Sequence, residues 1–152
     1  MKGGTYPEFI GQAGEHRVMS ELLIRGISPF TSRLDHGIDM ILINGKTIQV
    51  KTSKKHYNKA TNGSCYHFQL TGKWIKTNGE SKKRNSDKYD FLICWCIEDD
   101  VFYIIPSFEI LDKKSVDLYP NTIGKSPFGK TAFTRDRSKW NIYKSRWELL
   151  TI

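Results

Sequence analysis

Apolar side chains recur at helical spacing in the first part of the chain, over residues 8–25 (EFIGQAGEHRVMSELLIR). Pro7 suits the first turn of such a helix, and Gly26 stands just beyond it, where glycine commonly ends helices. The composition of residues 28–34 then predicts a strand. The N-terminal part of the chain therefore predicts one long helix that leads into a strand.

A β-hairpin is predicted next in the chain. Strands are expected over residues 38–43 and 46–52, on either side of the dipeptide Asn44-Gly45, which is typical of tight turns. The return strand alternates between polar and apolar residues, as expected for a strand with one buried face.

The middle of the chain predicts three further strands and a long loop. Residues 64–70 predict a strand, and the polar, highly charged residues 71–88 predict a loop or flap. Residues 90–97 (DFLICWCI) are almost continuously apolar, which indicates a strand buried on both faces. After an acidic turn, residues 101–105 predict a strand that ends at Pro106.

The pattern weakens towards the C-terminus. Ser107 is placed to cap a short helix, and residues 113–138, rich in Gly, Pro, Lys and Ser, predict irregular structure. A final short helix is favoured over a strand because aromatic residues recur at spacings of three and four: Trp140, Tyr143 and Trp147. The elements together predict an α/β layer architecture, and 152 residues fit a single domain, 1–152.

Positive charge is concentrated in two blocks of this chain, whose net charge is +8. Residues 51–88 carry ten basic and two acidic side chains, and residues 113–146 carry nine basic and two acidic ones. Residues 89–112, between the blocks, carry six acidic and no basic side chains. Basic blocks suit a polyphosphate partner, because each contact with a phosphate releases counterions. A lysine-rich surface that only interacts with solvent is the alternative.

Composition argues against several classes of protein. No apolar run approaches the ~20 residues that span a membrane, and the N-terminus lacks the apolar segment of a secretory signal. The three cysteines are an odd number without CxxC spacing, which argues against a disulfide framework and a zinc finger. We therefore expect a cytoplasmic protein that has no membrane partner and no organic cofactor.

The hairpin carries the clearest candidate chemistry. Gln49 and Lys51 point to the same face of the return strand because residues two apart share a face. Asp39 joins them only if the turn has the right length. A two-residue loop would pair Asp39 with Val50 and turn it away, whereas a three-residue loop ending in a left-handed Gly45 would pair Asp39 with Gln49. The sequence favours the three-residue loop, because Gly then occupies the position that needs it.

Glu15 is the fourth candidate. It lies in the helical stripe of Val18, Met19 and Leu22, where a carboxylate is costly unless something satisfies it. A divalent cation shared with Asp39 would do so. The alternative is that Glu15 only interacts favourably with the helix dipole near the helix start.

These groups suit phosphodiester hydrolysis with Mg²⁺, for which Mn²⁺ can substitute. The candidate ligands are oxygen donors, which Mg²⁺ prefers: the side chains of Asp39, Gln49 and Glu15 and the backbone carbonyl of Val50. Lys51 would orient the attacking water or help to deprotonate it, and would hold the phosphate. Because Gln49 is neutral, we expect weak cation binding that is completed only when the DNA phosphate arrives.

The order of these residues resembles that of the PD-(D/E)XK nuclease superfamily. A helix with Glu15 precedes GID at 37–39 and QVK at 49–51, so that Asp39 takes the place of the metal-binding aspartate and Lys51 that of the lysine.

Gln49 departs from the pattern, because most members of the superfamily carry Glu or Asp at that position. The group I intron-associated endonucleases use Q-x-K instead, and their IQVKT pattern looks like residues 48–52. The later stretch YDFLICWCIEDDVFYIIP is similar to their strand pair that ends in a proline. The resemblance covers roughly residues 8–106.

The resemblance implies a restriction-endonuclease-like mixed sheet flanked by helices and homing-type, site-specific cleavage of double-stranded DNA by a homodimer or a dimer of dimers. A basic flap at 71–88 and a basic C-terminal extension at 107–152 would contact the DNA. The DNA-binding candidates in and near these segments are Lys54, Lys55, Lys73, Lys82, Lys83, Arg84, Arg135, Arg137 and Lys139. Two alternatives remain: a nuclease that resolves Holliday junctions, and a nuclease-fold protein that binds DNA without cutting it.

Overall fold

A five-stranded mixed sheet forms the centre of the protein in a computed structural model, which describes residues 6–32, 37–58, 63–70, 75–77, 80–82, 88–121 and 137–152. The strand order is β1-β2-β3-β8-β9. The strands are Pro29–Thr31 (β1), Met40–Leu42 (β2), Thr47–Ser53 (β3), Phe91–Cys96 (β8) and Val101–Pro106 (β9). β3 and β8 run parallel, and the other neighbours run antiparallel. The predicted α/β class with a mixed sheet is confirmed, although β1 and β2 are shorter than predicted.

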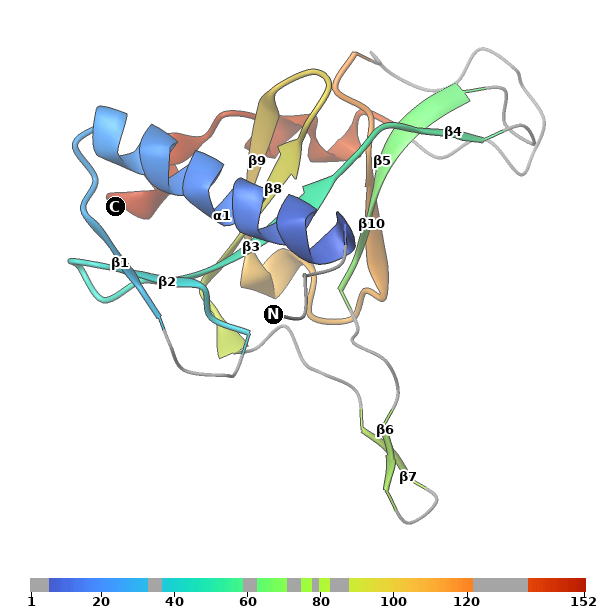
Figure 1. The fold of residues 1–152 in the computed structure, drawn as a ribbon, viewed down its shortest axis with the longest axis horizontal. Coiled ribbons are helices and arrows are strands. Elements are labelled where there is room, and N and C mark those ends of the chain that lie inside the picture. Colours follow the sequence, from blue (N-terminus) through green and yellow to red (C-terminus); the bar gives the residue numbers. More distant parts are fainter. Residues whose placement is uncertain are drawn as a thin grey trace.

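The long helix α1, Tyr6–Ile24, lies across one face of this sheet (Figure 1). It ends as its sequence predicts: Gly26 has a left-handed φ of 73°. The amide of Gly26 donates to the Leu23 carbonyl at 3.0 Å, and the amide of Ile27 donates to the Leu22 carbonyl at 2.9 Å. This pair of bonds is the Schellman arrangement, which satisfies carbonyls at the end of a helix.

The space between α1 and the sheet is filled by an apolar core. Val18 and Leu22 point from the helix into it, four residues apart on one face. The strands and the C-terminal segment supply its other buried members: Met40, Leu42, Ile48, Val50, Ile93, Phe102, Ile104, Trp147 and Leu150. The predicted stripe on the helix is therefore the face that fixes α1 to the sheet.

A second core lies on the opposite face of the sheet, beneath a three-stranded sheet of order β10-β5-β4. Its strands are Ser115–Leu118 (β10), Gly63–Gln69 (β5) and His56–Asn58 (β4). Leu92 and Cys94 of β8 pack into this core, whereas Ile93 packs into the core under α1. The prediction that this apolar strand is buried on both faces is confirmed.

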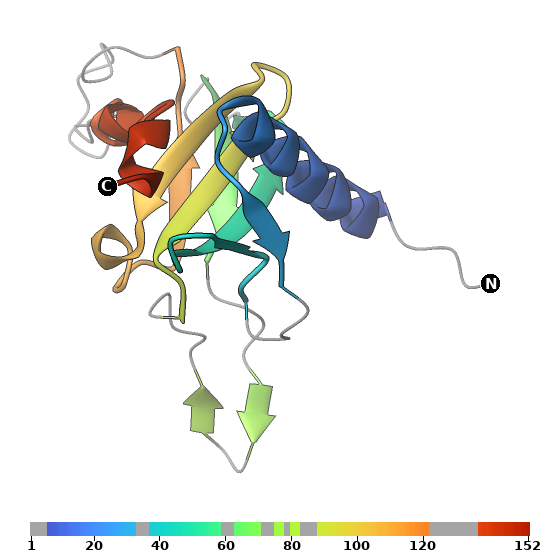
Figure 2. The same ribbon diagram turned by 90° about the vertical axis from the view of Figure 1, so that its left-hand side faces the viewer.

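Four short strands lie where the sequence predicted none: β4, β10, Ile75–Thr77 (β6) and Glu80–Lys82 (β7). β10 falls within residues 113–138, which were expected to be irregular, and β4 had no prediction. β10 forms because Val116 and Leu118 alternate into the second core, a pattern too short to stand out in a polar segment. The predicted flap contains the hairpin β6–β7, which projects away from the body (Figures 1 and 2).

The C-terminal segment forms 3-10 turns rather than a single helix. These are Ser107–Glu109 (η2), Lys139–Tyr143 (η4) and Trp147–Leu150 (η5). The predicted Ser107 cap is wrong, because Pro106 occupies the capping position and η2 has no side-chain cap. Trp140 and Trp147 belong to different cores, on opposite faces of the sheet, so they do not share one helical face. No described helix combines the length and apolar character needed to cross a membrane.

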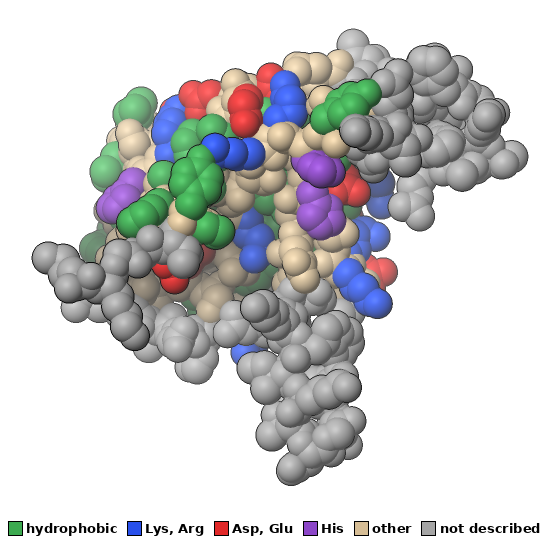
Figure 3. Space-filling view, turned by 45° about the vertical axis from the view of Figure 1, so that its right-hand side comes forward, with side chains coloured by type: hydrophobic (Ala, Val, Ile, Leu, Met, Phe, Trp, Pro, Cys, Tyr) green, Lys and Arg blue, Asp and Glu red, His purple; other side chains and the backbone are tan. Residues whose placement is uncertain are grey.

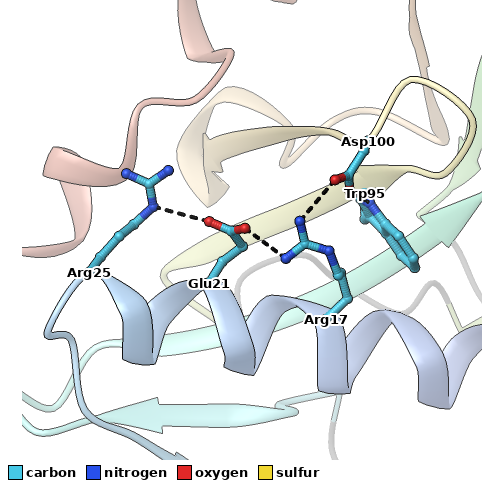
Figure 4. A network of polar contacts seen from close by, with 5 residues as sticks. All are labelled: Arg17, Glu21, Arg25, Trp95 and Asp100. Atoms are coloured by element: carbon cyan, nitrogen blue, oxygen red, sulfur yellow. Dashed lines mark hydrogen bonds and ion pairs between the residues drawn. The ribbon is translucent and has the colours of Figure 1, made fainter.

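A network of charges fixes the orientation of α1 against the turn between β8 and β9 (Figure 4). Arg17 pairs with Glu21 at 2.7 Å and with Asp100 at 2.9 Å. Arg25 lies 3.5 Å from Glu21, and the Trp95 indole donates to Asp100 at 2.7 Å. The acidic turn of the sequence thus holds the helix in place at the end of the central sheet.

Candidate active site

The β2–β3 hairpin has the register that brings the polar residues together. Met40 pairs with Ile48, which requires a three-residue loop, and Gly45 at the end of the loop has a φ of 84°. The Leu42 amide donates to the Lys46 carbonyl at 2.8 Å and closes this loop. The predicted three-residue turn is confirmed.

Asp39 forms hydrogen bonds with the two residues of β3 that flank Gln49. Its amide donates to the Ile48 carbonyl at 2.8 Å, and its carboxylate accepts the amide of Val50 at 2.7 Å. The second bond is possible because β2 begins only at Met40. The Val50 amide therefore has no backbone partner on β2, and the Asp39 side chain accepts it instead. The carboxylate is thereby held at the edge of β3, next to the residues that follow.

Gln49 and Lys51 lie on the face of β3 away from α1, because Ile48 and Val50 alternate with them and pack into the core under the helix. The amide of Gln49 lies against Gly37: a methyl group added there would stand 3.8 Å from Nε2 and 3.9 Å from Oε1. Gly37 has a φ of 76°, so glycine suits both the backbone and the space at this position.

Glu15 lies on α1 and interacts electrostatically with Asp39. Burial raises the pKa of Glu15 above its usual value, and the Asp39 carboxylate raises it further, although His16 opposes the change. Of the four residues that the sequence proposed as catalytic, Asp39, Gln49 and Lys51 lie on the β2–β3 hairpin, whereas Glu15, on α1, is related to them by this electrostatic interaction with Asp39.

Burial disfavours the charged forms of two carboxylates, Glu15 and Asp39, and neighbouring groups offset this only in part. The pKa of Asp39 is also raised, mainly by burial, against the opposing effects of the Val50 amide and the Lys51 ammonium. A group whose charged form is disfavoured in this way gains from a nearby cation. Among the described residues no three His, Cys, Asp or Glu side chains gather as a metal site. A cation here would therefore depend on two carboxylates together with neutral oxygen donors, a set that suits Mg²⁺.

Lys51 is placed between this site and the second core. It pairs with Cys94 across the parallel strands β3 and β8. Burial raises the pKa of the Cys94 thiol, and the Lys51 ammonium opposes that rise. Cys94 is therefore a neutral, buried neighbour of Lys51 rather than a reactive thiol.

The DNA-binding candidates differ in the partners that their charged groups have within the protein. Lys54 is exposed and contacts the Tyr6 hydroxyl, with its ammonium 4.6 Å from the centre of the Tyr6 ring. Lys55 is 3.1 Å from Asp99, so its charge already has a carboxylate partner. Figure 3 shows basic side chains, in blue, both within and around a hollow on one face of the protein.

Two of the other DNA-binding candidates, Arg137 and Lys139, lie against aromatic rings. Arg137 lies 5.3 Å above the Tyr119 ring, and Lys139 lies 5.0 Å from the centre of the Trp140 ring. Lys82 belongs to β7. The remaining candidates fall outside the described residues: Lys73, Lys83, Arg84 and Arg135.

Sequence reasoning missed the close contact between Gly14 and Thr52. Gly14 is buried one helical turn before Val18, and Thr52 follows Ile48 and Val50 on the face of β3 that meets α1. The signal was present in the sequence, because glycine is unfavourable inside a helix and Gly14 falls in the core-facing stripe.

The fold is restriction-endonuclease-like, with one long helix on a mixed sheet whose β2–β3 hairpin carries the polar residues. Among solved structures, the chain is similar to the bacterial homing endonuclease I-Ssp6803I, with a TM-score of 0.69. The match covers 96% of this chain and 93% of the other, at 16% sequence identity, so it shows a shared fold. No protein-family model matches the chain, and no curated protein matches it.

Proposed function

We propose that this protein is a magnesium-dependent, site-specific endonuclease that cleaves double-stranded DNA, of the homing type. The observation that carries the proposal is the placement of the Asp39 carboxylate, which is held by the Val50 amide at 2.7 Å and interacts electrostatically with both Glu15 and Lys51. The fold that this chain shares with a homing endonuclease also supports the proposed function.

Each residue has a distinct role in the proposed reaction. Asp39, Glu15, the Gln49 side-chain oxygen and the Val50 carbonyl would hold the cation, for which Mn²⁺ can substitute. When bound, Mg²⁺ lowers the pKa of a water molecule and stabilises charge that develops on the phosphate. Lys51 donates to the scissile phosphate and orients the attacking water. Gln49 adds an oxygen donor without adding negative charge, so the cation site carries two charges.

DNA is the proposed partner because of the two basic blocks of the sequence and the exposed Lys54 beside β3. Cutting both strands of a duplex takes two active sites, so we propose that the protein acts as a homodimer or a dimer of dimers.

The test uses a library of randomised DNA duplexes incubated with the full chain and Mg²⁺, followed by sequencing of the cut ends. We expect a shared motif at these ends, and no cutting in EDTA or by the Asp39→Ala variant. The matched control is Asp112→Ala, which removes an exposed aspartate outside the site.

Three results would contradict the proposal. Cutting of four-way junctions without a sequence motif would indicate a junction-resolving nuclease. DNA binding without cutting in Mg²⁺ or Mn²⁺ would indicate a DNA-binding protein on the same fold. Undiminished cutting by Asp39→Ala would show that the site lies elsewhere.

A further inference from the structure

Helix α1 and strand β3 approach each other most tightly where Gly14 faces Thr52. A Cβ atom added at Gly14 would stand 1.6 Å from Thr52 Oγ1, 2.9 Å from Thr52 Cβ and 3.4 Å from Thr52 Cγ2. No side chain fits at position 14 unless the helix, the strand or the Thr52 side chain moves. Gly11, one turn earlier on the same helix, has nothing within 4 Å of such an atom.

The hydroxyl of Thr52 gives a second, independent sign that this contact is specialised. Its oxygen is buried, and it has no hydrogen-bond partner among the described residues. A buried hydroxyl without a partner is costly, and a methyl group would avoid that cost. Oxygen is smaller than a methyl group, however, and here it lies roughly 3 Å or less from Gly14 Cα, because a Cα–Cβ bond adds only about 1.5 Å. Threonine therefore permits an approach that valine would prevent.

The two residues directly precede and follow the candidate catalytic groups in the sequence. Gly14 adjoins Glu15 on the helix, and Thr52 adjoins Lys51 on the strand. Since α1 is a rigid helix, the separation at this contact sets how far Glu15 lies from Asp39 and from β3. We propose that Gly14 and Thr52 are positioning residues that hold α1 close enough to β3 for Glu15 and Asp39 to share one cation. This inference depends on the proposed function, because it takes Glu15 as a cation-holding group.

The expected loss of metal binding and activity is large because metal sites tolerate little displacement of the groups that hold the ion. Metal sites require their groups within about 0.5 Å of the productive geometry, and a displacement of about 1 Å can lower a rate about 100-fold. A methyl group that must move from 1.6 Å to an ordinary contact distance forces a displacement of that order, unless Thr52 moves instead.

The experiment compares Gly14→Ala with Gly11→Ala in the 152-residue chain. Binding of Mn²⁺ is followed by the loss of the EPR signal of the free ion, cleavage is followed with Mg²⁺, and DNA affinity is measured in EDTA. For Gly14→Ala we expect at least tenfold weaker Mn²⁺ binding and about 100-fold slower cleavage at limiting Mg²⁺, with DNA affinity unchanged. For Gly11→Ala we expect the wild-type values.

Two further variants separate positioning from simple loss of folding. The double variant Gly14→Ala/Thr52→Gly removes the whole Thr52 side chain, which supplies every atom that clashes with the added methyl group. We expect this variant to recover Mn²⁺ binding. Thr52→Ser keeps the oxygen and should match the wild type, whereas Thr52→Val should weaken Mn²⁺ binding in the direction of Gly14→Ala.

The possible failures are distinguishable. If the wild type neither binds Mn²⁺ nor cleaves DNA, the proposed function fails. If the wild type does both, and Gly14→Ala equals Gly11→Ala, the positioning inference is overturned while the function stands. A double variant that folds, as judged by circular dichroism, but does not recover Mn²⁺ binding would also overturn the inference.

Discussion

The carboxylate of Asp39 accepts the backbone amide of Val50 at 2.7 Å, in the place where a neighbouring strand would otherwise pair with β3. This bond joins the loop before β2 to the strand that carries Gln49 and Lys51. It also opposes the rise in the pKa of Asp39 that burial causes. One hydrogen bond therefore both fixes the position of the carboxylate and helps to keep it charged.

Replacement of Lys51 should slow catalysis far more than it weakens DNA binding. Lys51→Met removes an ammonium that stabilises charge developing on the phosphate, and loss of one such donor typically lowers the rate about 10²- to 10³-fold. Single-turnover cleavage with saturating protein would measure the change. The exposed Lys114 serves as the control, since Lys114→Met should cut at the wild-type rate. An equal effect of both substitutions would argue that Lys51 contributes only general positive charge.

The metal-free protein should become less stable as the pH rises through the range in which Glu15 and Asp39 titrate. Their ordinary pKa values are 4.5 and 3.8, and both are raised in the folded state. The native state then binds more protons than the unfolded state between the ordinary and the raised values. The free energy of unfolding contributed by these groups is therefore greatest below the ordinary values and falls as the pH rises through the raised ones.

Asp39→Asn isolates this contribution from that of other groups. It removes the charge of Asp39 and its effect on Glu15, so the variant should gain stability over the wild type in EDTA as the pH rises. Each kcal/mol of gain corresponds to a rise in Tm of roughly 2–4 °C for a chain of this size. Thermal melts at several pH values, with EDTA and with Mg²⁺, would measure it. A difference that shrinks with rising pH would contradict the pKa shifts.

The C-terminal segment should be needed for stability because the β2–β3 turn holds it. Lys46 Nζ donates to the Leu149 carbonyl at 3.0 Å, and the Asn44 side chain donates to the Leu150 carbonyl at 2.8 Å. Leu150 is fully buried, so Leu150→Ala should lower the free energy of unfolding by about 2–5 kcal/mol. Ile152 is 84% exposed, and Ile152→Ala should change it by no more than about 0.5 kcal/mol. Urea unfolding of both variants would test the contrast.

Lys54 and Lys55 should behave differently towards DNA although they are adjacent. Lys54→Ala removes an exposed charge, so the slope of log Kd against log salt concentration should become shallower by about 0.9. Lys55 already pairs with Asp99 at 3.1 Å, so Lys55→Ala should leave that slope nearly unchanged. Fluorescence anisotropy across a salt series would measure both slopes, and identical changes would mean that Lys55 leaves Asp99 to bind a phosphate.

Local features of the sequence were enough to predict the helix, the hairpin and the buried strand. The helix ends where Gly26 can adopt a positive φ, and the hairpin has its register because Gly45 does the same. These predictions succeeded because they depend on backbone preferences and on burial patterns that span only a few residues. The register of the hairpin in turn placed Asp39 beside Gln49.

Contacts between distant segments decided the rest. The strand β10 was missed because its four residues form a strand only against β5 and the second core. The close approach of α1 to β3 joins Gly14 and Thr52, which stand 38 positions apart in the chain. Such distances come from the packing of side chains between elements, and no local preference of the chain specifies them.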